Sequence, residues 1–150
     1  MTNGVNHARI TTMLVIPATM ASMTVTQSPA IGLCVGIGVL SGLAIEPDLD
    51  IATLTYSERQ LIKHYGMWGR LWSAYWYFYG LSVQHRSKWM HQPILGTAVR
   101  LLYLLWLPLL IGLIFAPDIV TGFLFSEYFL AYFVGLVIAD TGHWLADGMP

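Results

Sequence analysis

The chain alternates long apolar stretches with one more polar segment near its centre. No charged residue occurs between Arg9 and Glu46, and a second apolar stretch, residues 94–139, contains only three. A single membrane crossing by a helix needs roughly 20 predominantly apolar residues. Each stretch is therefore long enough to cross a bilayer twice.

Proline-containing breaks divide both stretches near their middle. Gln27-Ser28-Pro29 interrupts the first and Pro117-Asp118 the second. Proline cannot donate a backbone hydrogen bond and restricts the residue before it, so each break predicts a tight turn. We expect spans at residues 10–26, 30–45, 94–116 and 119–139. The predicted fold is a single all-α domain, residues 1–150, built as an integral membrane four-helix bundle.

Basic residues set the predicted orientation. Arg9 precedes the first span, and the segment 46–93 contains Arg59, Lys63, Arg70, Arg86 and Lys88, whereas the two turns on the other side contain none. Lys and Arg are enriched in cytoplasmic loops. Both termini and segment 46–93 are therefore expected on the cytoplasmic side of a bacterial inner membrane, in a multi-pass protein.

Two charges fall inside the predicted spans. Arg100 lies within two turns of the start of its span, where a long side chain can snorkel to the interface. Glu127 lies deeper, where an ionised carboxylate is costly. We expect Glu127 to be protonated, paired or placed at an interface with a partner.

The central segment contains an aromatic repeat. Trp68, Trp72, Tyr75, Trp76 and Tyr79 recur every three or four residues, so they share one face if residues 67–79 are helical. Indole and phenol rings are enriched at membrane interfaces. This predicts an interfacial helix between spans two and three, whose aromatic face either packs on the bundle or faces a substrate.

Composition narrows the partners and the kind of metal site. The chain is 56% hydrophobic and 10% charged, with a net charge of −1. A lipid bilayer is the expected partner and nucleic acid is not, because no basic surface or nucleic-acid motif is present. Cys34 is the single cysteine, which excludes a thiolate zinc cage. Any metal here must be bound by nitrogen and oxygen.

Candidate ligands follow the predicted fourth span. Asp140, His143 and Asp147 have spacings of i, i+3 and i+7, which place two carboxylates and an imidazole on one helical face. An ordinary polar helix end is the plain alternative for these three residues. Their spacing is nevertheless typical of a metal site.

Further candidates lie at the other cytoplasmic ends. Asp48 and Asp50 follow span two in Glu46-Pro47-Asp48-Leu49-Asp50 and could chelate one ion or bridge two. His85 and His91 precede span three, with Arg86 and Lys88 between them as candidate ligands for a substrate phosphate. Without a metal, Asp48 and Asp50 would form an ordinary solvated helix end. Without a substrate, Arg86 and Lys88 would contact lipid headgroups. His64 is treated as a surface residue.

An even number of spans brings these groups to one side of the membrane. The starts of spans one and three meet the ends of spans two and four, so His7 joins the set. The predicted metal ligands are His7, Asp48, Asp50, His85, His91, Asp140, His143 and Asp147. Imidazole with carboxylate suits zinc, iron or manganese, and this number of ligands suits a dinuclear divalent centre.

Several of these motifs resemble a known family. Pro47-Asp48-Leu49-Asp50-Ile51, His85-Arg86-Ser87, His91-Gln92-Pro93-Ile94-Leu95-Gly96-Thr97 and His143-Trp144 with Asp147 are similar to a bacterial family of metal-binding membrane proteins of unknown function, related to membrane-bound metal-dependent hydrolases. The family usually has His-Gly-Pro where this chain has His91-Gln92-Pro93. The resemblance implies metal binding by these aspartates and histidines.

Three functions are compatible with this sequence. The first is a metal-dependent hydrolase acting on a phosphoester or ester at the cytoplasmic membrane surface, with Asp48 or Asp50 orienting the attacking water. The second is a non-catalytic metal-binding subunit or assembly protein of a larger membrane complex. The third, metal transport, is disfavoured because polar residues are sparse near the middle of the spans.

Overall fold

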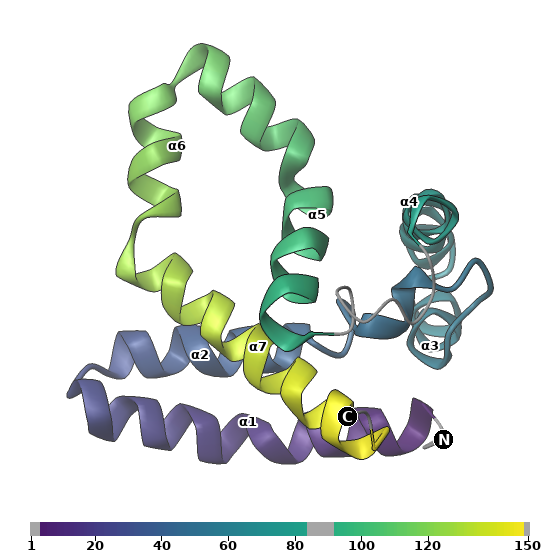
Figure 1. The fold of residues 1–150 in the computed structure, drawn as a ribbon, viewed down its shortest axis with the longest axis horizontal. Coiled ribbons are helices and arrows are strands. Elements are labelled where there is room, and N and C mark those ends of the chain that lie inside the picture. The colour runs from purple at the N-terminus through teal and green to yellow at the C-terminus, as the bar shows by residue number, and fades with distance from the viewer. Residues whose placement is uncertain (1–3, 84–91, 149–150) are drawn as a thin grey trace.

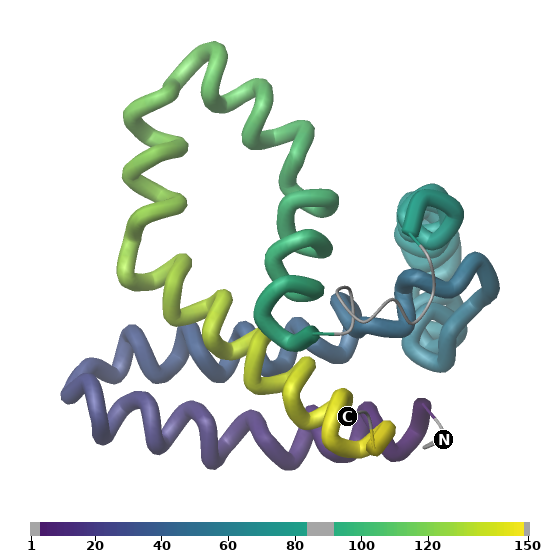
Figure 2. The backbone as a smooth tube through the Cα atoms, in the orientation of Figure 1, coloured from purple at the N-terminus to yellow at the C-terminus, as the bar shows by residue number. Residues whose placement is uncertain are grey.

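The structure, a computed structural model, describes residues 4–83 and 92–148, and every regular element in these ranges is a helix. The elements in order are α1 (Gly4–Thr26), α2 (Pro29–Ser41), the 3₁₀ turn η1 (Pro47–Asp50), α3 (Tyr56–Tyr65), α4 (Met67–Ser82), α5 (Pro93–Phe115), α6 (Pro117–Leu124) and α7 (Glu127–Ala146). Figures 1 and 2 show α1, α2 and α7 lying against one another, α5 rising from α7, and the α3–α4 hairpin to one side. The all-α prediction is confirmed.

The α1–α2 hairpin turns where the sequence predicts. The Ser28 hydroxyl accepts a hydrogen bond from the backbone N–H of Ile31, and Pro29 occupies the first turn of α2. Serine caps and proline at the first helical position both favour a helix start. Gln27 adopts the left-handed conformation that the tight turn requires, with φ of 54°.

Among the residues that the structure describes, three helices are long and apolar enough to cross a membrane: α1, α5 and α7. The second predicted span, residues 30–45, is shorter in the structure, because α2 ends at Ser41. Its 13 residues reach about 20 Å, less than the roughly 30 Å hydrocarbon core. The four-span bundle therefore stays a prediction, with three candidate spans supported by length and composition.

The fourth predicted span is not one helix. Residues 119–139 are divided between α6 and α7, because Ser126 caps a new helix by accepting a hydrogen bond from the backbone N–H of Phe129. Glu127 is thus exposed in the first turn of α7, where the helix dipole favours a carboxylate. The expectation that Glu127 lies deep within a continuous helix is corrected by this break.

Glycines bring α2 and α7 into close contact. A Cβ atom added at Gly38 would lie 2.2 Å from the carbonyl oxygen of Tyr132, and one at Gly135 would lie 2.1 Å from that of Val35. Small residues allow helix backbones to approach in this way. Val39 and Leu136 beside the crossing are fully buried. This contact fixes the direction of α7 relative to the first hairpin.

The predicted aromatic helix forms, and most of its aromatic residues pack on the core. Trp76 and Tyr79 are buried in a core with Tyr103 of α5, and the Tyr103 hydroxyl donates a 2.8 Å hydrogen bond to the Tyr75 carbonyl. Trp72 packs against the same core, whereas Trp68 is 71% exposed. Packing on the bundle, rather than a substrate-facing wall, is therefore what most of the predicted aromatic face does.

Candidate metal centre

The starts of α1 and η1 and the end of α7 meet in one place. Figure 1 shows both termini of the chain on the side of the molecule that carries the α3–α4 hairpin. The α1–α2 hairpin returns the chain to this end, and the close crossing of α2 with α7 brings the last turn of α7 to the first turns of α1. Within the described residues, the start of α1, η1 and the end of α7 lie together.

Three predicted ligands form a compact cluster. His7, His143 and Asp147 each offer one ligand atom, and these atoms lie within 4.8 Å of one another. His7 Nε2 is 3.2 Å from Asp147 Oδ1, and His143 Nε2 is 3.7 Å from Asp147 Oδ2. The two imidazole rings stack with centroids 3.7 Å apart and an angle of 10° between their planes. Both histidines are buried.

Asp48 lies beside this cluster on its more open side. Its Oδ1 atom is 3.7 Å from His143 Nε2, and its side chain is 27% exposed, compared with 7% for Asp147. Asp48 lies in η1, which begins at Pro47, soon after the end of α2. Asp48 is therefore the carboxylate of this group that solvent reaches most easily.

Asp50 and Glu46 flank Asp48 but are both buried, at 2% and 5% exposure. Burial raises the pKa of Glu46 to about 7, and a hydrogen bond from Ser57 opposes part of that increase. Glu46 was not among the predicted ligands, although it begins the same acidic run. Its burial could not be recognised from sequence because solvated acidic turns share the pattern.

Asp140, a predicted ligand, contacts a different set of residues. It forms an ion pair with Arg100 of α5 and accepts a hydrogen bond from the Thr97 hydroxyl, and all three side chains are buried. Arg100 is only 1% exposed, so the expectation that it snorkels to the interface is wrong. A buried guanidinium requires a charged partner, and Asp140 supplies it.

The remaining predicted residues are placed as follows. His64 is exposed on α3, as expected. His85, Arg86, Lys88 and His91 lie outside the described residues. Their assignment as metal and substrate ligands stays a prediction from the sequence.

The residues present fit a metal ion. His143 Nε2 is buried without a hydrogen-bond partner and lies 3.7 Å from both Asp48 Oδ1 and Asp147 Oδ2, which leaves room for an ion between the imidazole and the carboxylates. Two imidazoles with carboxylate oxygens are usual ligands for zinc and for iron. Two ligands of a tetrahedral ion, each at about 2.1 Å, lie about 3.4 Å apart. Atoms of the cluster that lie up to 4.8 Å apart would therefore have to approach one another on binding.

Comparison with known proteins agrees with this geometry. Residues 2–150 match the family described as "Uncharacterized metal-binding protein (DUF2227)". The chain belongs to this family of metal-binding proteins. The match covers nearly the whole chain, including both ends, from which His7, His143 and Asp147 come. A metal cofactor is therefore supported by family membership and by the cluster independently.

The other two comparisons found nothing to add. No curated protein and no solved structure matches the chain. The family description gives metal binding without a reaction, a substrate or the identity of the metal. Chemistry beyond binding must be argued from the residues of the cluster.

Proposed function

We propose that the chain is a membrane-embedded, metal-dependent hydrolase of phosphoesters or esters, with its site at the cytoplasmic surface of a bacterial inner membrane. The observation that carries the proposal is the division of the site into a buried part and an open part. His7, His143 and Asp147 form the buried part, and Asp48 stands beside them with its carboxylate partly exposed. Catalytic metal sites typically combine three protein ligands with an open position.

A divalent ion held by His7, His143 and Asp147 would lower the pKa of a coordinated water and polarise an ester or phosphoryl oxygen. Asp48 is placed to orient the attacking water and accept its proton, because its carboxylate is close to His143 and accessible to solvent. Asp50 is buried, so we assign it a supporting role in holding η1 and leave contact with substrate to Asp48.

The basic residues support the cytoplasmic orientation. Arg9 lies in the second turn of α1, and Arg59, Lys63 and Arg70 belong to α3 and α4, which Figure 1 shows on the side of the N-terminal end of α1. The α1–α2 turn at the other end of α1 has no charged residue. The positive-inside rule then places the site on the cytoplasmic side. Reporter fusions at each terminus and at the Gln27 turn test this orientation directly.

The test of catalysis separates binding from chemistry. Purified protein is loaded with zinc, iron or manganese, its metal content is measured, and hydrolysis of a phosphodiester, a carboxylic ester and phospholipid vesicles is assayed. Asp48→Asn should retain metal and lose most activity, because the amide cannot accept the proton. His143→Ala should lose both, and His64→Ala should lose neither. A fully loaded protein that is inactive on all three substrates would refute the hydrolase.

A second candidate function is favoured by the burial of the cluster. His7 comes from α1, His143 and Asp147 come from the end of α7, and all three side chains are almost inaccessible to solvent. A metal ion bound by them would connect the first helix to the last and stabilise the fold. The chain would then be a non-catalytic, metal-binding subunit or assembly protein of a larger membrane complex. In that case metal loading would raise the unfolding temperature and preserve a complex on native gels, and Asp48→Asn would change neither.

A further inference from the structure

The outer face of α4 is apolar and uncovered. Met67, Leu71, Ala74, Phe78 and Leu81 follow one another at intervals of four and three residues, and all five are exposed. Phe78 is 64% exposed and Leu71 54%. Residues at this spacing lie on one side of a helix. We call these five residues the α4 stripe, and it is distinct from the opposite face, where Trp76 and Tyr79 enter the core.

The charges beside the stripe have one sign. Arg59, Lys63 and Arg70 of the α3–α4 hairpin are exposed, whereas its Glu58 is 4% exposed and occupied in capping α3, accepting a hydrogen bond from the backbone N–H of Thr55. Within residues 56–82, the exposed Lys, Arg, Asp and Glu side chains are therefore all basic. Such a surface complements the anionic headgroups of a cytoplasmic leaflet.

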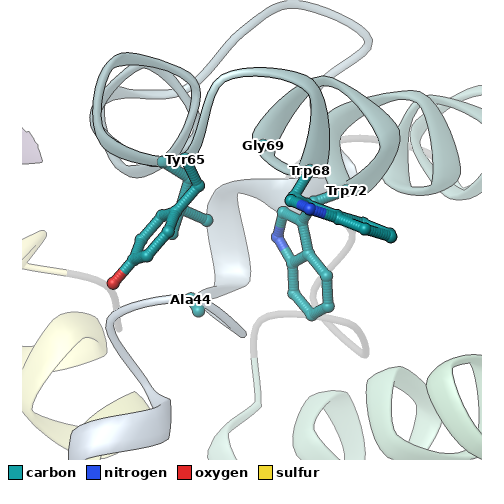
Figure 3. A pocket seen from close by; sticks show the side chains of 6 residues that line it. Ala44, Tyr65, Trp68, Gly69 and Trp72 are labelled. Carbon is teal, nitrogen blue, oxygen red and sulfur yellow. The ribbon is translucent and has the colours of Figure 1, made fainter.

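The hairpin also has exposed aromatic residues away from the stripe, on the side of α4 that faces Ala44. Figure 3 shows Tyr65, Trp68 and Trp72 projecting from the hairpin around a pocket of about 360 Å³, with Ala44 on its other side. Tyr65 and Trp68 are 64% and 71% exposed. Tyrosine and tryptophan rings prefer the boundary between headgroups and acyl chains.

The direction of α4 fits the same environment. In Figures 1 and 2, α4 is seen along its axis, whereas the candidate spans α1, α5 and α7 are seen from the side. α1 and α5 run in clearly different directions within the plane of view, and α4 runs across both, so α4 lies along the membrane surface whichever of them follows the membrane normal. Amphipathic helices in this position bury their apolar face a few ångströms below the headgroups.

We propose that the α3–α4 hairpin is an interfacial anchor that lies on an anionic lipid bilayer, with the α4 stripe in the acyl boundary and Arg59, Lys63 and Arg70 at the headgroups. The occupant of the exposed face is lipid, because the stripe is apolar and the exposed charged side chains of residues 56–82 are all basic. The proposal does not depend on catalysis. It rests on the exposed face of α4 and on the candidate spans.

The test measures what each position contacts. Full-length protein with Cys34→Ala is given one new cysteine at Leu71, Phe78, Arg70 or Ser73, labelled with a nitroxide and placed in bilayers containing phosphatidylglycerol. Collision with oxygen reports lipid, and collision with a water-soluble nickel chelate reports water. Arg70 is the matched control on the flank of the stripe, and Ser73, 7% exposed, is the control for burial in protein.

At Leu71 and Phe78 we expect an oxygen-to-nickel collision ratio several-fold above that at Arg70, with Ser73 protected from both reagents. Free access of the nickel chelate to the stripe would overturn the proposal, because the face would lie in water. Protection of the stripe from both reagents, as at Ser73, would overturn it too, since a second copy or another protein would then cover α4.

The electrostatic part has its own variant. The combined substitution Arg59→Gln, Lys63→Gln and Arg70→Gln removes the exposed basic charge without touching the stripe. Each basic residue near an anionic surface contributes roughly a fivefold change in partitioning. The oxygen-to-nickel collision ratio at Phe78 should therefore fall in this variant. It should also fall when the protein without these three substitutions is placed in purely zwitterionic bilayers. An unchanged ratio in both experiments would refute the role of the three basic residues.

Discussion

The ion pair between Arg100 and Asp140 distinguishes two interpretations of Asp140, and its removal can be predicted quantitatively. The sequence alone makes Asp140 a metal ligand, whereas the structure pairs it with Arg100 and Thr97. Asp140→Asn keeps the shape of the side chain and removes its charge. Arg100, 1% exposed, would then be a buried cation without a counter-ion.

Breaking a buried pair from one side typically costs about 3–5 kcal/mol, whereas replacing both members with apolar residues of similar size is often neutral or stabilising. Asp140→Asn and Arg100→Met should each lower the free energy of unfolding by about this amount. The double variant Arg100→Met with Asp140→Leu should recover most of the loss, because no buried charge remains. Both single variants should still bind metal.

The assay is denaturant unfolding of purified protein in detergent, followed by circular dichroism, with metal content measured on the same samples. Asp118→Asn, at an exposed position in the first turn of α6, is the matched control for loss of a carboxylate. The reasoning would be refuted if Asp140→Asn released the metal while Arg100→Met left stability unchanged. Asp140 would then act as a ligand, as its spacing from His143 first indicates.

Three other predictions follow from particular contacts. His143→Ala should abolish stoichiometric metal binding in elemental analysis, whereas His64→Ala should leave it intact. Gly135→Ala should destabilise the fold by about 1–3 kcal/mol through overpacking, because its Cβ would meet the Val35 carbonyl, whereas Gly122→Ala, with nothing within 4 Å, should be neutral or slightly stabilising. Thr55→Ala should cost about 1 kcal/mol of unfolding free energy, because it removes half of the capping box that starts α3.

The sequence predicted those parts of the fold that depend on local chemistry. Ser28 and Pro29 start α2 and Pro117 starts α6, because capping and the missing proline N–H act within one turn of the chain. The break at Ser126 was missed, since a single serine in an apolar stretch is a weak signal. The hydrogen bond from the Phe129 backbone N–H to the Ser126 hydroxyl shows that a new helix begins there.

Long-range pairing could not be predicted in the same way. Arg100 and Asp140 are forty positions apart, and nothing in the spacing of either residue names the other as its partner. The aromatic repeat of α4 left two interpretations open, packing on the bundle or contact with a substrate, because apolar and aromatic residues occur around much of the helix. The spacing of the aromatic residues identifies one face of α4. Only the packing of Tyr103 against Trp76 and Tyr79 shows that this face is buried.

The cluster around His143 depends on both local sequence signals and long-range packing. Asp147 is one helical turn from His143, so their proximity is local, but His7 and Asp48 reach them only because two hairpins return the chain to one end. The glycine crossing of α2 and α7 and the ion pair of α5 with α7 hold α7 on either side of that end. Metal affinity should therefore depend on residues that never touch the ion, because a shift of α7 separates His143 and Asp147 from His7 and Asp48 together.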